Sequence, residues 1–280
     1  MIAVRGFALV GGLTLTSACL AQQKPAAIET EHIFGFTEGS DIGDQGELEF
    51  ESTTVGAFGK PGGYAVVSNE LAARYGVIQG FRAALGVLTD YHNIHDSPGL
   101  NDVSALDFSG VSTEFRWAAM PRAESPFGLT LSFAPYWRRI DATGGGRQDG
   151  AYLPLTLLVD RELLPGKLVA AFNAGYGPSF ARASSGPWLT EHDVEISTAL
   201  AYQIQDGLFL GGELRHEMRY QIGAYPAHAL FVGPSFFVRL SESMSAKIAW
   251  SAQIPGVGSG RLNLGTYERH EVLLLISKTF

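Results

Sequence analysis

The chain has 280 residues, enough for one large all-β domain or two ordinary domains. Its formal net charge is −8 and only 17% of its residues are charged, which argues against a nucleic-acid-binding protein. Glycine is abundant, at 34 residues, and no stretch after residue 21 has the length and apolarity of a transmembrane helix.

The first 21 residues have the pattern of a secretory signal peptide, with Arg5 before a short apolar core and small residues after it. We predict cleavage after Ala21. An uncleaved membrane anchor would need about 20 apolar residues. Lipoprotein processing at Cys19 usually requires leucine three residues earlier, where Thr16 stands. Loss of Cys19 leaves a chain without cysteine, so disulfides, thiolate metal sites and cysteine nucleophiles are not expected.

Residues 22–45 do not have the pattern of a membrane-crossing strand, because apolar residues alternate irregularly with glycine and acidic residues between Glu31 and Gly43. We expect a separate N-terminal segment that is a latch on the first strand, a lid over an opening, or a plug inside the fold. The acidic residues of this segment lack the spacing of a twelve-residue calcium loop, so no calcium site is predicted.

From residue 46 onward the chain reads as long strands separated by turn residues. The connections alternate between short turns, such as Gln205-Asp206, and longer polar loops, such as Thr143–Gly150. The predicted strands are 46–58, 63–77, 80–94, 106–119, 127–142, 151–163, 167–182, 188–204, 207–221, 228–241, 244–258 and 263–280.

Apolar and polar side chains alternate along most of these strands, which exceed the five or six residues of an average soluble strand. In 207–221, for example, Leu208, Leu210 and Leu214 alternate with charged residues. Strand length, alternation and loop pattern together predict a single antiparallel up-and-down transmembrane β-barrel over residues 46–280. Twelve strands are expected, with ten or fourteen as alternatives. Such a barrel carries its apolar residues outside, and aromatic residues near strand ends are expected to form girdles at the two membrane boundaries.

The last strand ends on an aromatic residue, as is typical of the terminal strand of a bacterial outer-membrane barrel. Leu274, Ile276 and Phe280 share one face and are the predicted assembly signal. Lys278 departs from this pattern, because an aromatic or apolar residue commonly occupies that position, although its long stem can reach the interface.

The opposite face of the strands carries both signs of charge, and we predict that it lines the lumen. Glu70 is expected to pair with Arg74, Glu114 with Arg116, Glu213 with Arg215 and Glu217 with Arg219. Such pairs either brace the wall or line a water-filled pore, since unpaired buried charges are costly. The predicted lumen-lining residues are Glu70, Arg74, Arg82, Glu114, Arg116, Glu213, Arg215, Glu217, Arg219 and Arg239.

The segment His-Ile-Phe-Gly-Phe-Thr-Glu-Gly-Ser-Asp-Ile-Gly at residues 32–43, followed by Gly46-Glu47 and a barrel, resembles an uncharacterised family of proteobacterial, mainly alphaproteobacterial, outer-membrane β-barrel proteins. The resemblance is specific over residues 31–51. It implies a cell outer-membrane location, after signal-peptide-directed export to the periplasm of a Gram-negative bacterium. It implies no substrate and no functional residues.

Known barrel enzymes have catalytic patterns that this chain lacks. None of the seven histidines precedes a serine in the arrangement of the outer-membrane phospholipase. His92 and His95, with Asp90 and Asp96, form the best metal-like cluster, but the two histidines would lie on different faces of a strand. Gly144-Gly145-Gly146 neither follows a parallel strand nor begins a helix, so it is no phosphate loop. No catalytic residue, metal or cofactor is therefore predicted.

We thus expect a passive or weakly selective channel for small hydrophilic solutes, because the inner face is too polar for a dry core. A sealed barrel that supports the envelope is the alternative. A lipid-acting envelope enzyme and a soluble β-sandwich or calycin-like binder remain as further hypotheses. The expected partners are outer-membrane lipid and lipopolysaccharide, the barrel-assembly machinery and small solutes, but no nucleic acid.

Overall fold

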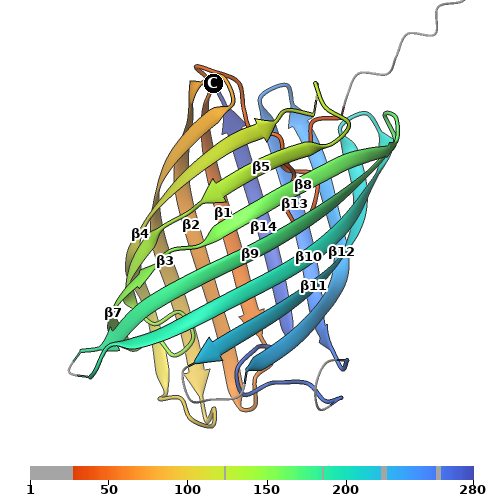
Figure 1. Cartoon of the computed structure of the whole chain (residues 1–280). Coiled ribbons are helices and arrows are strands. Elements are labelled where there is room, and N and C mark those ends of the chain that lie inside the picture. Colours follow the sequence, from red (N-terminus) through yellow and green to blue (C-terminus); the bar gives the residue numbers. More distant parts are fainter. Residues whose placement is uncertain (1–27, 123, 185, 222–225, 257–259) are drawn as a thin grey trace, which may run out of the picture.

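The computed structural model describes residues 28–122, 124–184, 186–221, 226–256 and 260–280, so the predicted signal peptide lies outside the described residues. The strands form one antiparallel sheet that closes when β1 pairs with β14 (Figure 1). They are β1 (Leu48–Phe58), β2 (Gly63–Ile78), β3 (Phe81–His95), β4 (Val103–Met120), β5 (Gly128–Phe133), β6 (Tyr136–Ile140), β7 (Arg147–Tyr152), β8 (Leu155–Leu164), β9 (Leu168–Ala183), β10 (Leu189–Gln205), β11 (Leu208–Gln221), β12 (Ala227–Ser241), β13 (Met244–Ile254) and β14 (His270–Thr279).

The fourteen strands build a ring of twelve, as predicted. β5 and β6 are two halves of one wall strand, since both pair with β4, and β7 and β8 are likewise two halves that both pair with β9. The interruptions fall at Pro135 and Pro154, because proline has no N–H to donate to the neighbouring strand. Their carbonyl oxygens still accept hydrogen bonds, from Thr113 N at 2.9 Å and from Ala134 N at 3.0 Å.

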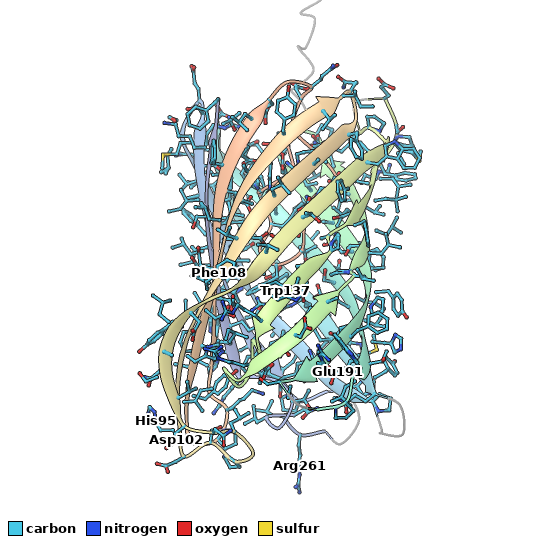
Figure 2. The ribbon with its side chains drawn as sticks, turned by 90° about the vertical axis from the view of Figure 1, so that its left-hand side faces the viewer. His95, Asp102, Phe108, Trp137, Glu191 and Arg261 are labelled. Atoms are coloured by element: carbon cyan, nitrogen blue, oxygen red, sulfur yellow. The ribbon has the colours of Figure 1, made fainter. Side chains whose placement is uncertain are left out.

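The two faces of the wall have the inverted polarity that the alternation predicts. Outward apolar side chains such as Leu85 and Leu106 are 70% and 73% exposed, whereas inward Glu49 and Asp90 are 3% and 0% exposed. A soluble protein would place these two classes the other way round. Figure 2 shows the outward side chains as a layer that surrounds the wall, with Phe108 and Trp137 labelled. The predicted inside-out assignment of the strand faces is therefore confirmed.

The barrel has two different ends. One end, called here the turn end, carries the short connections β2–β3, β8–β9, β10–β11 and β12–β13, together with the C-terminus (Figure 1). Gly80 and Gly207 have positive φ angles of 75° and 70° in these turns, a conformation that side-chain-bearing residues rarely adopt. The other end, called the loop end, carries the longer loops, and His95, Asp102 and Arg261 lie there in Figure 2.

Three sequence expectations need correction. Residues 147–150 belong to strand β7, although they were assigned to a polar loop, because the wall strand continues beyond the break at Pro154. Residues 263–269 form a loop before β14 rather than the start of the last strand. The expectation that aromatic residues near strand ends form girdles fails for three tyrosines: Tyr64 and Tyr267 are buried at 8% and 5% exposure, and Tyr136 lines a cavity. The outward girdle residues are Tyr91, Trp117, Trp137, Trp188, Tyr220 and Trp250.

Within the part of the chain that the structure describes, no helix is long and apolar enough to cross a bilayer.

Candidate functional site: the lumen and its N-terminal plug

Residues 28–43, called here the plug, lie inside the barrel. Ile33 and Phe34 are 2% and 1% exposed, because they pack against small and apolar inward residues of the wall. The apolar cluster around the plug contains Ile28, Val169, Ala171, Ala199, Ala201, Phe209 and Phe237.

Near the turn end, the plug is fixed by Asp160 of β8, whose side chain is 2% exposed. One oxygen of this carboxylate accepts hydrogen bonds from Thr30 Oγ1 and from Ser40 N, both at 2.6 Å. Arg122, in the turn between β4 and β5, reaches inward and pairs with Asp41 at 2.5 Å. A charged acceptor makes these hydrogen bonds stronger than neutral ones, so they hold both ends of the plug against one side of the wall.

Deeper in the lumen, two wall residues bind the plug backbone. Glu213 of β11 accepts hydrogen bonds from Phe36 N at 3.2 Å and Thr37 N at 2.9 Å. Asn173 of β9 accepts one from Glu38 N at 2.7 Å and donates one to Glu38 O at 2.9 Å. These contacts satisfy backbone groups of a non-helical, non-strand segment, which would otherwise be left unpaired in a buried place.

A buried ion-pair network joins the plug to β1, β3 and β4. Arg82 contacts Glu31 of the plug and lies 3.6 Å from both Glu49 and Glu114. His32 Nε2 lies 2.8 Å from Glu49 Oε1. Each charge has at least one partner, as burial of charged groups requires.

Two further arginines extend this network toward the loop end. Arg74 pairs with Glu51 and lies 3.8 Å from Glu114. Arg116 pairs with Glu114 on its own strand and with Glu38 of the plug. Glu114 is therefore shared among several arginines, and the network lies in the half of the barrel next to the turn end.

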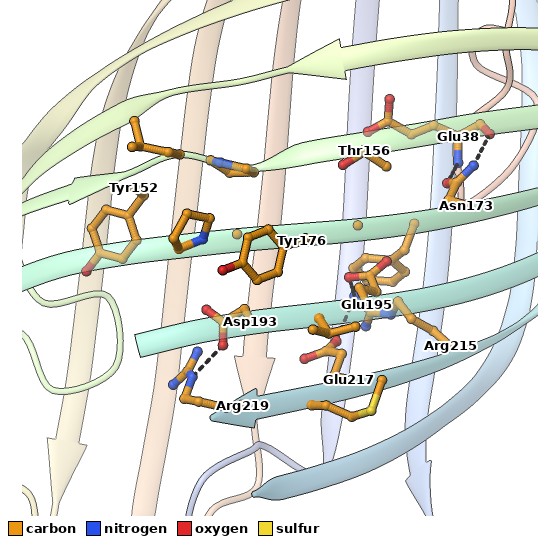
Figure 3. Close-up of a pocket in the computed structure, with 18 of the residues that line it drawn as sticks. Glu38, Tyr152, Thr156, Asn173, Tyr176, Asp193, Glu195, Arg215, Glu217 and Arg219 are labelled. Carbon is orange, nitrogen blue, oxygen red and sulfur yellow. Dashed lines mark hydrogen bonds and ion pairs between the residues drawn. The ribbon is translucent and has the colours of Figure 1, made fainter. Parts of the chain in front are cut away.

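A second charged group lies on β10 and β11, nearer the loop end (Figure 3). Arg215 pairs with Glu217 at 3.0 Å and with Glu271, and its guanidinium lies 4.2 Å from the ring centroid of Phe36 in the plug. Arg219 pairs with Asp193 at 2.8 Å, directly across the β10–β11 ladder.

The predicted lumen-lining residues lie on the inner face, but most of them choose other partners than expected. Only Arg116 and Glu114 form the pair that was predicted. Glu70 accepts a hydrogen bond from Ser112, and Glu213 binds the plug. Residues four apart on a strand are about 13 Å apart, so Glu70 and Arg74 cannot meet along one strand. Arg239 lies near the turn end, 45% exposed in its side chain, with Asp206 at 3.8 Å.

Several inner-face residues were missed by sequence reasoning. Glu49, Glu51, Asp160 and Glu195 occupy the same alternating positions as the predicted residues, and this alternation was the available signal. Lys247 of β13 is 5% exposed, lines a cavity, and forms no ion pair within the described residues.

Within the described part of the chain, three cavities follow one another along the lumen. The loop-side cavity, of about 510 Å³, and the central cavity, of about 260 Å³, share Phe36, Glu38 and Tyr136. The central cavity and the turn-side cavity, of about 600 Å³, share Glu31 and His32 of the plug. The three cavities therefore lie next to one another, with residues of the plug between them.

The loops at the loop end fold partly over the opening. Arg138 pairs with Asp90 at 2.5 Å, and His92 Nε2 lies 3.2 Å from Ala142 O in the β6–β7 loop. Lys60 Nζ donates a hydrogen bond to Thr266 O at 2.7 Å in the β13–β14 loop. Burial lowers the pKa of Lys60, and nearby Glu268 opposes this shift.

The residues that suggest metal chemistry do not make a convincing site. His92 is buried, whereas His95 is exposed, so they do not converge. Among the described residues, Glu31, His32 and Glu49 bring three ligand-type atoms within 4.8 Å of one another. Arg82 already pairs with Glu31 and lies beside Glu49, so its guanidinium balances the negative charge that would otherwise attract a metal ion.

Solved structures with this fold are outer-membrane barrels. The COG4313 outer-membrane channel from Pseudomonas putida F1 has a TM-score of 0.56 and 11% identity, covering 86% of this chain and 97% of that one. The NanC porin has a TM-score of 0.52 and 11% identity, covering 82% and 98%. The translocator domain of the autotransporter NalP from Neisseria meningitidis has a TM-score of 0.51 and 16% identity, covering 86% and 91%. Channels and translocators thus share this fold, which does not by itself select a function.

No curated protein matches the chain. Residues 26–280, which include the plug and the complete barrel, match DUF6662, a family of unknown function. The chain therefore belongs to the DUF6662 family.

Proposed function

We propose that this protein is an outer-membrane channel for small hydrophilic solutes, narrowed by its own N-terminal plug. The observation that carries the proposal is the row of three polar cavities that follow one another between the turn end and the loop end. Neighbouring cavities share lining residues, and Glu31, His32, Phe36 and Glu38 of the plug are among the shared ones. A barrel of about twelve strands lies between small filled barrels and wide porins, which agrees with a narrow passage.

Water in the lumen is supported by the exposure of its charged side chains. The side chains of Glu38 and Glu195 are each 40% exposed although they lie inside the wall. Charged groups in a dry interior would cost several kcal/mol each, so their exposure indicates a wet, open space.

Membrane placement is supported by the continuous apolar outer surface and by the last strand. Phe280 N donates a hydrogen bond to Leu48 O at 2.8 Å, and Leu274, Ile276 and Phe280 all face outward. We propose that the turn end faces the periplasm, since short turns belong to that side of outer-membrane barrels. The assembly machinery would then read the terminal strand, and lipid and lipopolysaccharide would contact the outer surface.

We propose that solutes pass only when Glu31 and His32 move, because these two residues lie between the central and the turn-side cavities. This is tested by recording single-channel currents from the chain that begins at residue 22, refolded in detergent and added to a planar bilayer. A heat-dependent gel shift confirms beforehand that the barrel has formed. Discrete small steps are expected from this protein, and larger steps after deletion of residues 22–45.

A disulfide between plug and wall provides the matched control. A Cβ atom at Gly128 would lie 2.9 Å from Ser40 Cβ. This is slightly shorter than the Cβ–Cβ distance of a disulfide, so Ser40→Cys with Gly128→Cys can form one after the plug and the wall move slightly apart. Oxidation of this double variant is expected to reduce the current, and reduction to restore it. Each single variant controls for the substitutions.

The second candidate function is a sealed structural barrel, without transport or catalysis. It is favoured by one observation, the buried arginine–carboxylate network that joins the plug to β1, β3 and β4. A folded barrel that remains silent, both with its plug and without it, would support this candidate against the channel.

A further inference from the structure

We infer that the lumen selects for positively charged solutes over negatively charged ones. This inference rests on the proposed channel function and names its substrate class: small cations and cationic organic solutes such as amines and guanidinium compounds. The observation behind it is an excess of carboxylates over basic side chains in all three cavities.

The turn-side cavity shows the excess most clearly. Among the described residues that line it, Arg239 is the only basic side chain besides His32, and it lies 3.8 Å from Asp206. Among the described residues, four of its carboxylates form no ion pair. These are Glu29, Asp44, Glu47 and Glu242. A solute entering from this end therefore meets carboxylates without ion pairs, three of them on residues outside the plug.

The central cavity is more balanced but remains acidic. Arg74, Arg116 and Lys247 line it, together with five glutamates. Glu70 is one of these; Ser112 donates a hydrogen bond to it, and it forms no ion pair among the described residues. Lys247 is the opposing feature, because it is a buried cation that forms no ion pair with any residue the structure describes.

In the loop-side cavity, two arginines face five carboxylates. Arg215 is shared among Glu217, Glu271 and Glu195, the last of these at 4.0 Å. One guanidinium cannot neutralise three carboxylates, so a net negative charge remains.

The barrel wall strengthens the effect that this excess of carboxylates has on passing ions. A narrow space with low-dielectric walls focuses the field of its charges, and rings of acidic side chains are a known basis of cation selectivity. At 0.1 M salt the screening length is about 10 Å in bulk water, and confined charges are screened less. A cation thus meets an attractive potential in all three cavities, whereas an anion meets an electrostatic barrier.

The test is the reversal potential of the chain from residue 22, recorded in a planar bilayer under a tenfold KCl gradient. The expected sign is that of K⁺ selectivity, with a permeability ratio of K⁺ to Cl⁻ well above one. Asp44→Asn with Glu242→Gln is expected to move this ratio toward one, because both carboxylates line the turn-side cavity and are unpaired.

Glu124→Gln with Asp102→Asn is the matched control, since it removes two charges from exposed loop positions outside the three cavities. It is expected to leave the ratio unchanged. A current without preference, or with Cl⁻ preference, overturns this inference and leaves the channel proposal standing. A folded barrel that passes no current overturns both.

Discussion

Arg82 of β3 and Glu31 of the plug form an ion pair inside the barrel, with side chains only 3% and 7% exposed. Glu49 and Glu114 lie 3.6 Å from the same guanidinium, and Arg116 lies directly across the β3–β4 ladder from Arg82. Two like charges face each other there and are held together by the carboxylates around them. Glu31 of the plug therefore provides one of the negative charges that offset the repulsion between Arg82 and Arg116 in the wall.

Replacement of Arg82 is expected to destabilise the folded barrel and loosen the plug. Arg82→Met leaves Glu31, Glu49 and Glu114 with less compensation, and breaking a buried pair typically costs about 3–5 kcal/mol. The temperature at which the gel shift disappears should fall clearly. Arg182→Met is the control, because its pair with Asp149 is about half exposed and such pairs contribute about 0–1 kcal/mol. Equal effects of the two variants would contradict a special role of the buried network.

Gly35→Ala is expected to displace the plug. A Cβ atom at this position would lie 2.8 Å from Ala249 Cβ on β13, so the plug has to move away from the wall. A glutamate-specific protease should then cleave the folded protein at Glu31 or Glu38, and mass spectrometry would detect the fragments. Gly146→Ala is the control, since its added Cβ would meet nothing within 4 Å. If the plug of Gly35→Ala resists cleavage, the wall rather than the plug has moved to make room for the added methyl group.

An arginine on the outer surface should reduce folding in a manner that depends on its depth in the bilayer. Leu214, midway along β11, is 41% exposed on the outer face. Leu214→Arg is expected to cost about 2–4 kcal/mol, against about 0–1 kcal/mol for Leu208→Arg at the strand end. Denaturant titration of the gel-shifted form in lipid vesicles measures both. If the costs are equal and small, the outer surface does not face hydrocarbon.

Phe280→Ala is expected to impair assembly in cells more than stability in detergent. Phe280 is 68% exposed and contacts Phe50 edge-to-face at a centroid distance of 5.7 Å, so its removal leaves no cavity. The fraction of heat-shifted protein in outer-membrane preparations should fall, while refolding in detergent should continue. Phe236→Ala, another outward phenylalanine, is the control. Similar losses from both variants would argue against terminal recognition.

The sequence alone suffices to predict which side chains point outward from the wall and which point into the lumen. Alternation along a strand is a local property, because successive side chains point to opposite faces. The twelve-strand count followed from the same pattern. Even Pro135 and Pro154, which divide two wall strands, did not change the count, since both halves keep the same neighbours.

The partners of the charged residues were decided only by the tertiary structure. Side chains directly opposite each other on neighbouring strands are about 4.5–5.5 Å apart, closer than residues two apart on one strand, so Arg219 meets Asp193 rather than Glu217. The position of the plug was likewise undetermined, because a short irregular segment has no periodicity that indicates what it packs against. Its site depends on Asp160 and Glu213, which lie 120 and 176 residues away from Ser40 and Thr37 and come together only when the barrel closes.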